Sequence, residues 1–125
     1  MKTDFNSLSL GFGKRITKVY MELTEKRREY ILTKQLLRSG TAVGALYREA
    51  NYAESKADLI HKLHIAIKEC NESVYWIDLL EHMGKLNQTE HASLRGDAVS
   101  LLKILTAMIK TAKRNKENGE WRMEN

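Results

Sequence analysis

The fold is decided by residues 35–80, whose sequence is QLLRSGTAVGALYREANYAESKADLIHKLHIAIKECNESVYWIDLL. Apolar residues recur at steps of three and four on both sides of a polar interruption at 51–54, which is typical of two amphipathic helices joined by a loop. Ser55 followed by Asp58 has the pattern of a capping box and predicts where the later helix begins. Gly84 is a natural stop for this helix. Its predicted apolar seam comprises Ile60, Leu63, Ile67, Cys70, Val74 and Ile77, broadened by Leu59, Ala66, Trp76, Leu80 and Met83.

The flanking sequence extends this pattern to four helices. The chain contains no proline, and no segment alternates as a strand would. A first helix is predicted over residues 5–23, a short polar turn over 24–28, and a second helix from there to about Ala50. The fourth helix is predicted to start at Thr89 as its N-cap. Its apolar positions are Leu94, Ala98, Leu101, Leu105, Met108 and Ala112, and those of the first helix are Phe12, Ile16, Val19, Tyr20 and Leu23.

Four helices with short connections predict an all-α fold, an antiparallel up-down-up-down four-helix bundle. No linker or internal repeat divides the chain, so residues 1–125 are expected to form one domain with a frayed tail after about residue 116. No apolar run approaches the roughly 18 residues of a membrane span, and the first residues do not resemble a secretory signal. We therefore expect a cytoplasmic protein without a membrane partner. Cys70 is the only cysteine, so no internal disulfide can form.

The positive charge of the chain is unevenly distributed. The formal net charge is +5, and residues 1–62 hold twelve Lys and Arg against seven Asp and Glu, whereas residues 63–125 hold nine of each. Two basic faces are predicted: Lys14, Arg15 and Lys18 on the first helix, and Arg27, Lys34 and Arg38 on the second, with Arg48 at its edge. Such faces suit the phosphate backbone of RNA or DNA. The alternative is solvated charge interleaved with Glu22, Glu25 and Glu29.

The second helix also carries a flank that is nearly free of side chains. Leu37, Gly40 and Gly44 lie between the basic side and the core side, which comprises Leu32, Leu36, Val43, Tyr47 and Ala50. Because glycine inside a helix costs roughly 0.5–1 kcal/mol relative to alanine, we expect another helix to approach closely here. That helix can belong to the same bundle or to another subunit. Leu37, Gly40 and Gly44 are therefore candidates for close packing or for an oligomer interface.

Catalytic, metal and cofactor sites have little support in the sequence. There is no P-loop, dinucleotide fingerprint or GxSxG motif. His61 and His64 form at most half of a metal site, because a metal needs three or four converging ligands. Glu69 and Glu72 lack the partners of a di-iron bundle and are interpreted as salt-bridge residues. We predict no catalytic residue, no metal and no cofactor, with an enzyme or metal protein as a minor alternative.

Two segments of the chain agree with the sequence pattern of a known family. The agreeing positions are Gln35 to Thr41, Gly44, Ala45, Glu49, Ala50, Ser55 to Asp58, Ile60 to Leu63, Ala66, Lys68, Glu69, Glu72, Tyr75, Trp76 and Leu80. With these residues, most of the chain up to about Gly84 resembles the small bacterial four helix bundle proteins, also called 23S rRNA intervening-sequence proteins. Two positions depart from the family pattern, because Ala42 replaces a usual serine and Leu46 a usual asparagine.

The resemblance implies an architecture and a set of partners. Members of this family form ring-like homopentamers of antiparallel four-helix protomers. They are related to the accessory variability proteins of diversity-generating retroelements, which associate with nucleic acid and a reverse transcriptase. We therefore expect a non-enzymatic homo-oligomer, a pentamer, that offers basic surfaces to RNA, DNA or a nucleic-acid-processing protein. The alternative is a structural or protein-interaction module that binds no nucleic acid.

Overall fold

A computed structural model describes residues 4–114 as four α-helices without a strand. They are α1 (Phe5–Glu25), α2 (Leu32–Ala50), α3 (Lys56–His82) and α4 (Gln88–Arg114). The predicted all-α class is therefore confirmed for this part of the chain. The predicted tail after about residue 116 lies outside the described residues. Between residues 4 and 114, no helix combines the length and the apolar character that crossing a membrane requires.

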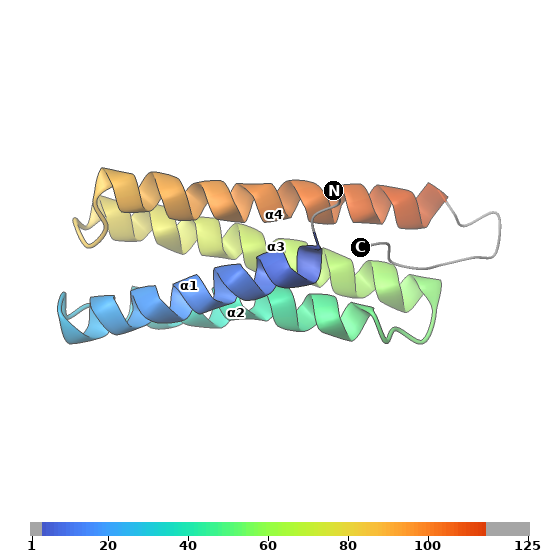
Figure 1. Ribbon diagram of the computed structural model, residues 1–125, viewed down its shortest axis with the longest axis horizontal. Coiled ribbons are helices and arrows are strands. Elements are labelled where there is room, and N and C mark those ends of the chain that lie inside the picture. Colours follow the sequence, from blue (N-terminus) through green and yellow to red (C-terminus); the bar gives the residue numbers. More distant parts are fainter. Residues whose placement is uncertain (1–3, 115–125) are drawn as a thin grey trace.

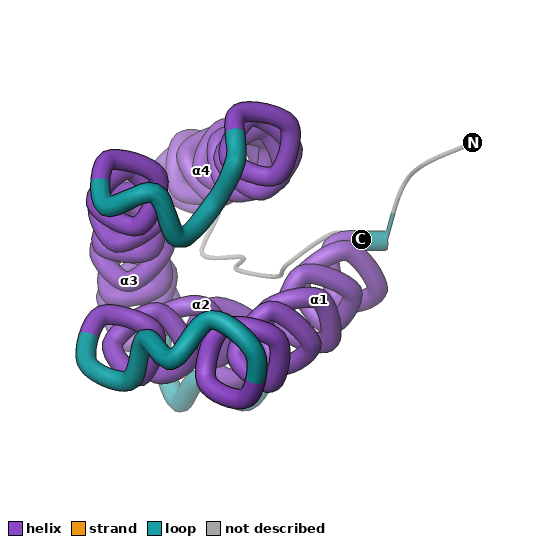
Figure 2. The backbone as a smooth tube through the Cα atoms, turned by 90° about the vertical axis from the view of Figure 1, so that its left-hand side faces the viewer, coloured by secondary structure: helices purple, strands orange, loops and turns teal. Residues whose placement is uncertain are grey.

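The helices lie in two layers, with α1 beside α2 and α3 beside α4 (Figure 1). Consecutive helices are joined at alternate ends of the molecule, so the turn from α1 to α2 and the turn from α3 to α4 share one end. The tube view shows α2 packed against both α1 and α3, whereas α1 and α4 stand apart (Figure 2). The bundle is therefore more open between its first and last helices than between consecutive ones.

Each helix buries the apolar face that its spacing predicts. On α3 the predicted positions Leu63, Cys70 and Ile77 are fully buried, whereas Ile60 and Ile67 are half-buried and Met83 is exposed. On α4 Ile109 is buried, whereas the predicted Met108 is only half-buried. The remaining buried apolar residues include Phe5, Phe12, Ile16, Leu23, Leu36, Val43, Tyr47, Ala50, Leu59, Leu80, Leu94, Leu101 and Leu105.

The start and end of α3 confirm two local predictions. The Ser55 hydroxyl accepts a hydrogen bond from the backbone N–H of Asp58 at 3.0 Å, and the Asp58 carboxylate accepts one from the N–H of Glu54 at 3.2 Å. These contacts satisfy backbone donors that the first turn of a helix leaves unpaired. At the other end Gly84 has φ +75°, a left-handed conformation that glycine adopts without strain.

The starts of α2 and α4 differ from the sequence predictions. α1 continues to Glu25 and α2 begins only at Leu32, so the connection is longer than the predicted turn over 24–28. The buried carboxylate of Glu29 accepts hydrogen bonds from the backbone N–H groups of Ile31, Leu32 and Thr33 at 2.9–3.2 Å. Glu29 is thus an anionic cap for α2, since a carboxylate suits the positive end of a helix. The sequence reasoning did not predict this cap.

The capping residue of α4 is Asn87, and the prediction of Thr89 was wrong. The Asn87 side-chain oxygen accepts from the backbone N–H of Glu90 at 2.8 Å, and the Glu90 carboxylate accepts from the N–H of Asn87 at 2.9 Å. This reciprocal pair has the geometry of a capping box with asparagine as the cap. Both Asn87 and Thr89 are acceptable cap residues by type, and only the pairing with Glu90 distinguishes them.

The two glycines of α2 allow α1 to approach closely within the same chain. A methyl group at position 40 would lie 3.0 Å from Cγ1 of Ile16, and one at position 44 would lie 3.3 Å from the hydroxyl of Ser9. Ile16 and Ser9 both belong to α1 and are buried. Leu37 is half-buried against the core of the same bundle. Contact within the protomer therefore accounts for both glycines.

Filling the space at Gly40 should destabilise the protein, whereas filling open space at another helical glycine should not. We predict that Gly40→Val lowers the free energy of unfolding by about 1–3 kcal/mol, because the buried Ile16 has no room to move. Gly96 on α4 has no neighbour within 4 Å, so Gly96→Ala should raise it by about 0.5–1 kcal/mol. Urea unfolding followed by circular dichroism measures both. A Gly40→Val protein as stable as the wild type would contradict the close approach.

Candidate nucleic-acid interface

A groove of about 390 Å³ runs along the outside of the bundle where α1 meets α2. We call it the α1–α2 groove. Small side chains dominate its floor, because the close approach of the two helices places glycine, alanine, serine and threonine along the seam. Its lining comprises Asn6, Ser9, Leu10, Gly13, Lys14 and Thr17 from α1 and Thr41, Gly44, Ala45 and Arg48 from α2.

Basic side chains stand on both walls of this groove. Lys14 lines the α1 wall, and the exposed Lys18 follows one helical turn later. Arg48 lines the α2 wall, and the exposed Lys34 lies on the same side of α2, two turns before Thr41. Within residues 4–114 none of these four cations forms an ion pair. Arg48 donates from Nε to the neutral side-chain oxygen of Asn6 at 3.1 Å.

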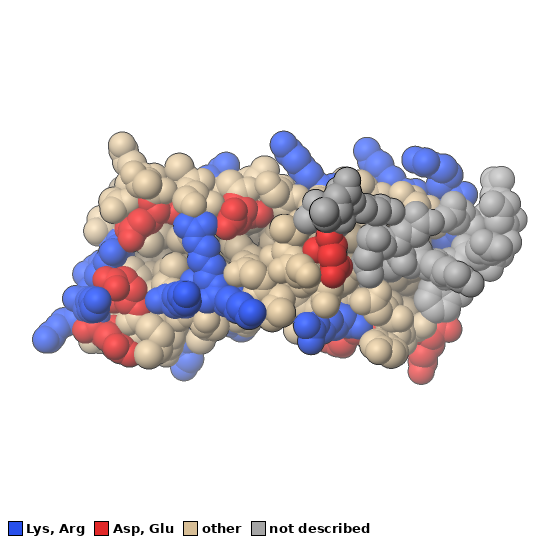
Figure 3. Space-filling view, in the orientation of Figure 1, with Lys and Arg blue, Asp and Glu red and all other residues tan. Residues whose placement is uncertain are grey.

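Arg15 belongs to a different contact from its neighbours Lys14 and Lys18. Its guanidinium donates to the carboxylate of Asp97 at 2.7 Å and to the hydroxyl of Ser93 at 2.7 Å, both on α4. Arg15 therefore crosses the open side of the bundle and joins α1 to α4. On the face drawn in Figure 3, Lys and Arg side chains over α1 are mixed with Asp and Glu side chains.

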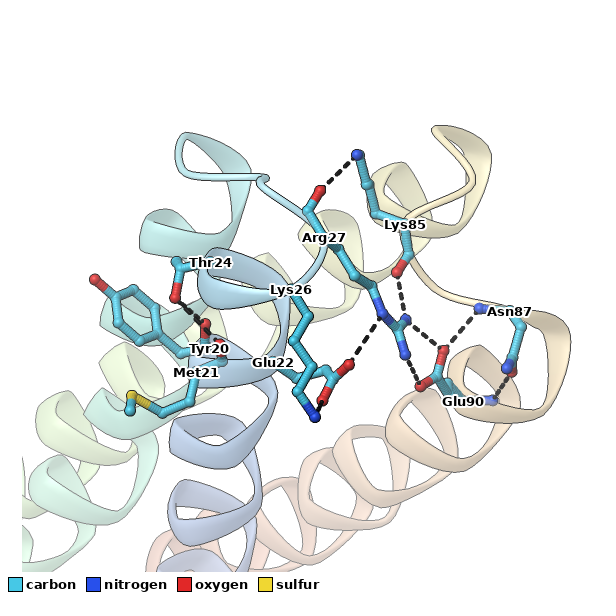
Figure 4. Close-up of polar contacts among 9 residues, drawn as sticks. All are labelled: Tyr20, Met21, Glu22, Thr24, Lys26, Arg27, Lys85, Asn87 and Glu90. Atoms are coloured by element: carbon cyan, nitrogen blue, oxygen red, sulfur yellow. Dashed lines mark hydrogen bonds and ion pairs between the residues drawn. The ribbon is translucent and has the colours of Figure 1, made fainter.

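Arg27 joins the two turns at one end of the molecule (Figure 4). It lies in the connection between α1 and α2, so the prediction that it shares a face of α2 with Lys34 and Arg38 was wrong. Its guanidinium donates two parallel hydrogen bonds to the carboxylate of Glu90, at 2.8 and 2.9 Å, and one to the carbonyl of Lys85 at 2.7 Å. The Lys85 ammonium donates back to the carbonyl of Arg27 at 2.7 Å.

These contacts shift the pKa values of both Arg27 and Glu90. The hydrogen bond from Arg27, followed by the backbone hydrogen bond from Asn87, holds the pKa of Glu90 below its usual range. The same hydrogen bond raises the pKa of Arg27. A two-pronged guanidinium–carboxylate contact is both stronger and more directional than a contact between point charges. Arg27 therefore serves to fasten the two turns together.

Arg38 joins α2 to α3. Its guanidinium donates to the carboxylate of Glu69 at 3.0 Å and also to that of Glu72. The indole N–H of Trp76 donates to the same Glu72 carboxylate at 3.0 Å, which holds that side chain in place. The interpretation of Glu69 and Glu72 as salt-bridge residues agrees with this geometry. Since both acids lie beside Arg38, its positive charge is largely balanced.

The seven predicted basic residues thus separate into two groups. Arg15, Arg27 and Arg38 bind carboxylates of their own chain. Lys14 and Arg48 remain available in the α1–α2 groove, and the exposed Lys18 and Lys34 remain available beyond its lining on the same helices. Sequence reasoning missed the floor of the groove on α1. A signal was present, because Ser9, Gly13 and Thr17 repeat small residues at every fourth position of the first helix.

The remaining chemically active side chains do not gather into a site. Within residues 4–114 no group of three or more His, Cys, Asp or Glu side chains could hold a metal ion. His61 and His64 are both exposed. His91 is half-buried, and its Nε2 lies 2.7 Å from the carboxylate of Asp78. Burial raises the pKa of the Cys70 thiol to about 12, which leaves it unreactive at neutral pH.

Removal of the Glu90 charge should destabilise the folded protein only at pH values at which that carboxylate is ionised. Because the pKa of Glu90 is lower in the folded chain, its contribution is present above the usual carboxyl pKa and is lost as the pH falls through the folded value. We predict that Glu90→Gln lowers the free energy of unfolding by about 1–2 kcal/mol at neutral pH, after allowance for solvent screening. The difference from wild type should shrink as the pH falls through the lowered pKa of Glu90.

Thermal unfolding across this pH range measures the effect of Glu90. The matched control is Glu25→Gln, which removes an exposed carboxylate that forms no ion pair within residues 4–114. The control should follow the wild type at every pH. An equal loss for both variants, or a loss that does not shrink as the pH falls, would show that the Arg27–Glu90 contact does not stabilise the fold through charge.

Two comparisons with known proteins identify the family. The model of the 23S rRNA-intervening sequence protein family matches residues 2–107. The fold is similar to a crystal structure of a protein with unknown function from the S23 ribosomal protein family of Bacteroides thetaiotaomicron VPI-5482, with a TM-score of 0.84 and 40% sequence identity over 86% of this chain and 99% of that chain. No curated protein matches. The expected relation to retroelement accessory proteins stays a prediction. The chain belongs to the family of 23S rRNA-intervening sequence proteins.

Proposed function

We propose that this protein is a non-enzymatic cytoplasmic scaffold that binds the backbone of RNA or DNA along the α1–α2 groove. Its antiparallel up-down-up-down protomers assemble into a ring-like homo-oligomer, a pentamer, which repeats the groove around the ring. One observation carries the proposal of nucleic-acid binding. Lys14 and Arg48 stand on opposite walls of one groove, the exposed Lys18 and Lys34 continue the same sides of α1 and α2 beyond it, and none of the four forms an ion pair within residues 4–114.

The chemistry of the groove favours backbone contact over the recognition of base sequence. Lysine ammonium groups on flexible stems bind phosphates as point charges and release counterions when they do so. The groove floor offers few groups that could distinguish one base from another, because its hydroxyls at Thr17 and Thr41 already donate to carbonyls of their own helices. Binding should therefore depend strongly on salt and weakly on sequence.

An aromatic side chain lies at one end of the groove. Asn6 and Arg48, which line the groove, also line a neighbouring depression together with Tyr52. Tyr52 is 88% exposed, which leaves its ring open for stacking with an unpaired base. This arrangement supports single-stranded RNA or DNA as a ligand whose backbone follows the groove.

The non-enzymatic part of the proposal rests on how the acidic residues are used. Glu69 and Glu72 are the paired carboxylates that most resemble acid–base groups, and both are bound by Arg38. The same scaffold can present nucleic acid to a processing protein that supplies the chemistry. Such a partner is part of the proposal.

Loss of the groove lysines should flatten the salt dependence of binding. We predict that Lys14→Gln, Lys18→Gln and Lys34→Gln together reduce the slope of log K against log salt by about 2 for a single strand, since each phosphate contact contributes about 0.7. Fluorescence anisotropy with a labelled single strand measures the slope. The matched control is Lys26→Gln, because the Lys26 ammonium already lies 3.5 Å from Glu22.

The Lys26→Gln control tests whether binding depends on lysines that have no ion pair or only on net charge. Lys26→Gln should leave the slope unchanged, and Lys14→Gln alone should reduce it by about 0.7. Equal effects of these two single variants would show that only net charge counts. If the wild type does not bind a single strand or a duplex even at low salt, the nucleic-acid proposal falls.

A second candidate function, a protein-interaction module without nucleic acid, is favoured by the apolar side chains that remain exposed. Ile31 is 76% exposed and its neighbour Tyr30 is 57% exposed, both in the connection between α1 and α2. Exposed apolar side chains at adjacent positions support a protein contact. The same two residues support the homo-oligomer, which both candidate functions require.

The oligomer should depend on these apolar side chains. We predict that light scattering of the wild type at micromolar concentration gives the mass of a homo-oligomer, five protomers if the ring is a pentamer, and that Ile31→Glu gives a smaller species because it places a charge in an apolar contact. Tyr52→Ser, at the other end of α2, serves as the control and should assemble normally. A wild-type monomer would contradict the ring.

A further inference from the structure

The second half of α4 carries a row of basic side chains that the α1–α2 groove does not include. Residues 98–114 contain four Lys and Arg and no Asp or Glu. Lys103, Lys110 and Arg114 are spaced by seven and four residues, so they lie within about 40° of one another around the helix. All three are exposed, and they lie opposite the buried Leu105. We call these three residues the α4 row.

Among residues 4–114, the α4 row has no acidic partner of the kind that balances basic residues elsewhere in the bundle. In the first half of α4, Arg95 lies 3.3 Å from Asp78, and Asp97 binds Arg15. Within residues 4–114 no ion pair includes a member of the α4 row. Figure 3 shows Lys and Arg side chains projecting from the molecule over this half of α4. Within the described part of the chain, the row is thus a patch of positive charge that no acidic residue balances.

The helix dipole accounts for only part of this charge. Basic side chains in the last turn, such as Arg114, are stabilised by the negative end of the helix. That effect is confined to the last turn, and Lys103 lies three turns earlier. Solvated protein surfaces usually mix charges of both signs, whereas this half of the helix has only one. A ligand of opposite charge explains the whole row.

The chemistry of the row fits a nucleic-acid backbone better than a membrane surface. Helices that lie on membranes expose large apolar side chains beside their basic ones. On α4 the residues exposed between Lys103 and Lys110 are Thr106 and Ala107, and no large apolar side chain of α4 is exposed. The row spans about 16 Å at 1.5 Å per residue, a length along which a duplex presents about ten charges.

We infer that the α4 row is a second binding surface for the phosphate backbone of nucleic acid, separate from the α1–α2 groove. α4 belongs to the layer opposite α1 and α2 (Figures 1 and 2). One protomer therefore contacts nucleic acid from both layers. The inference takes its ligand, nucleic acid, from the proposed function. It adds a second set of binding residues that the α1–α2 groove does not contain.

Substitution of the α4 row tests the inference separately from the groove. Lys103→Gln, Lys110→Gln and Arg114→Gln together should reduce the slope of log K against log salt for a short duplex by about 2.7, and Lys103→Gln alone by about 0.9. Lys26→Gln is again the matched control and should have no effect, because Glu22 already pairs with it. All substituted positions are exposed, and circular dichroism would verify that each variant stays helical.

The outcomes distinguish the two surfaces. If the α4 variant keeps the wild-type slope while the Lys14, Lys18, Lys34 variant loses part of it, the inference is overturned and the proposed function stands. If only the α4 variant loses slope, the inference stands and the groove proposal falls. Loss of binding to phosphatidylserine vesicles, with duplex binding unchanged, would assign the α4 row to a membrane and overturn the inference. A wild type that binds neither probe at low salt overturns both.

Discussion

The close approach of α1 to α2 is the contact on which the rest of the structure depends. At Gly40 a methyl group would already stand 3.0 Å from the buried Ile16 side chain, so the two helices are too close here for any residue larger than glycine to fit without a shift. This approach brings Phe5 and Tyr47 into the core with ring centroids 4.6 Å apart. On the outside, the same small residues leave the α1–α2 groove between the basic walls of the two helices. Core packing and the candidate interface therefore have one cause.

Arginine and lysine have different roles in this protein. Arg15, Arg27 and Arg38 each join elements that are distant in sequence, because a planar guanidinium can donate to two acceptors at once. The lysines of the groove and of the α4 row form no ion pair within residues 4–114. A lysine binds anions as a mobile point charge, which suits an irregular phosphate backbone. These three arginines thus hold the bundle, whereas these lysines are available to a ligand.

Local charge matters more here than the total for each half of the chain. Residues 63–125 hold equal numbers of basic and acidic residues, which predicts no basic surface in that half. Its acids, however, are used within the bundle: Glu69 and Glu72 bind Arg38, and Glu90 binds Arg27. The acids of the second half thereby neutralise arginines of the first. This exchange leaves Lys14, Lys18 and Lys34, and the α4 row, without an ion pair within residues 4–114.

The sequence by itself determined the four helices, most of the core and the capping of α3, because these follow from spacing and from contacts within a few residues. It also located the glycines that permit close packing. Only the tertiary structure decided that α1 of the same chain fills the space beside Gly40, that Asn87 rather than Thr89 caps α4, and that Arg27 belongs to a turn bound to Glu90. In each of these three contacts, the residue could have paired with any of several partners of similar type. Which partner it contacts depends on distance in space, which spacing along the chain does not specify.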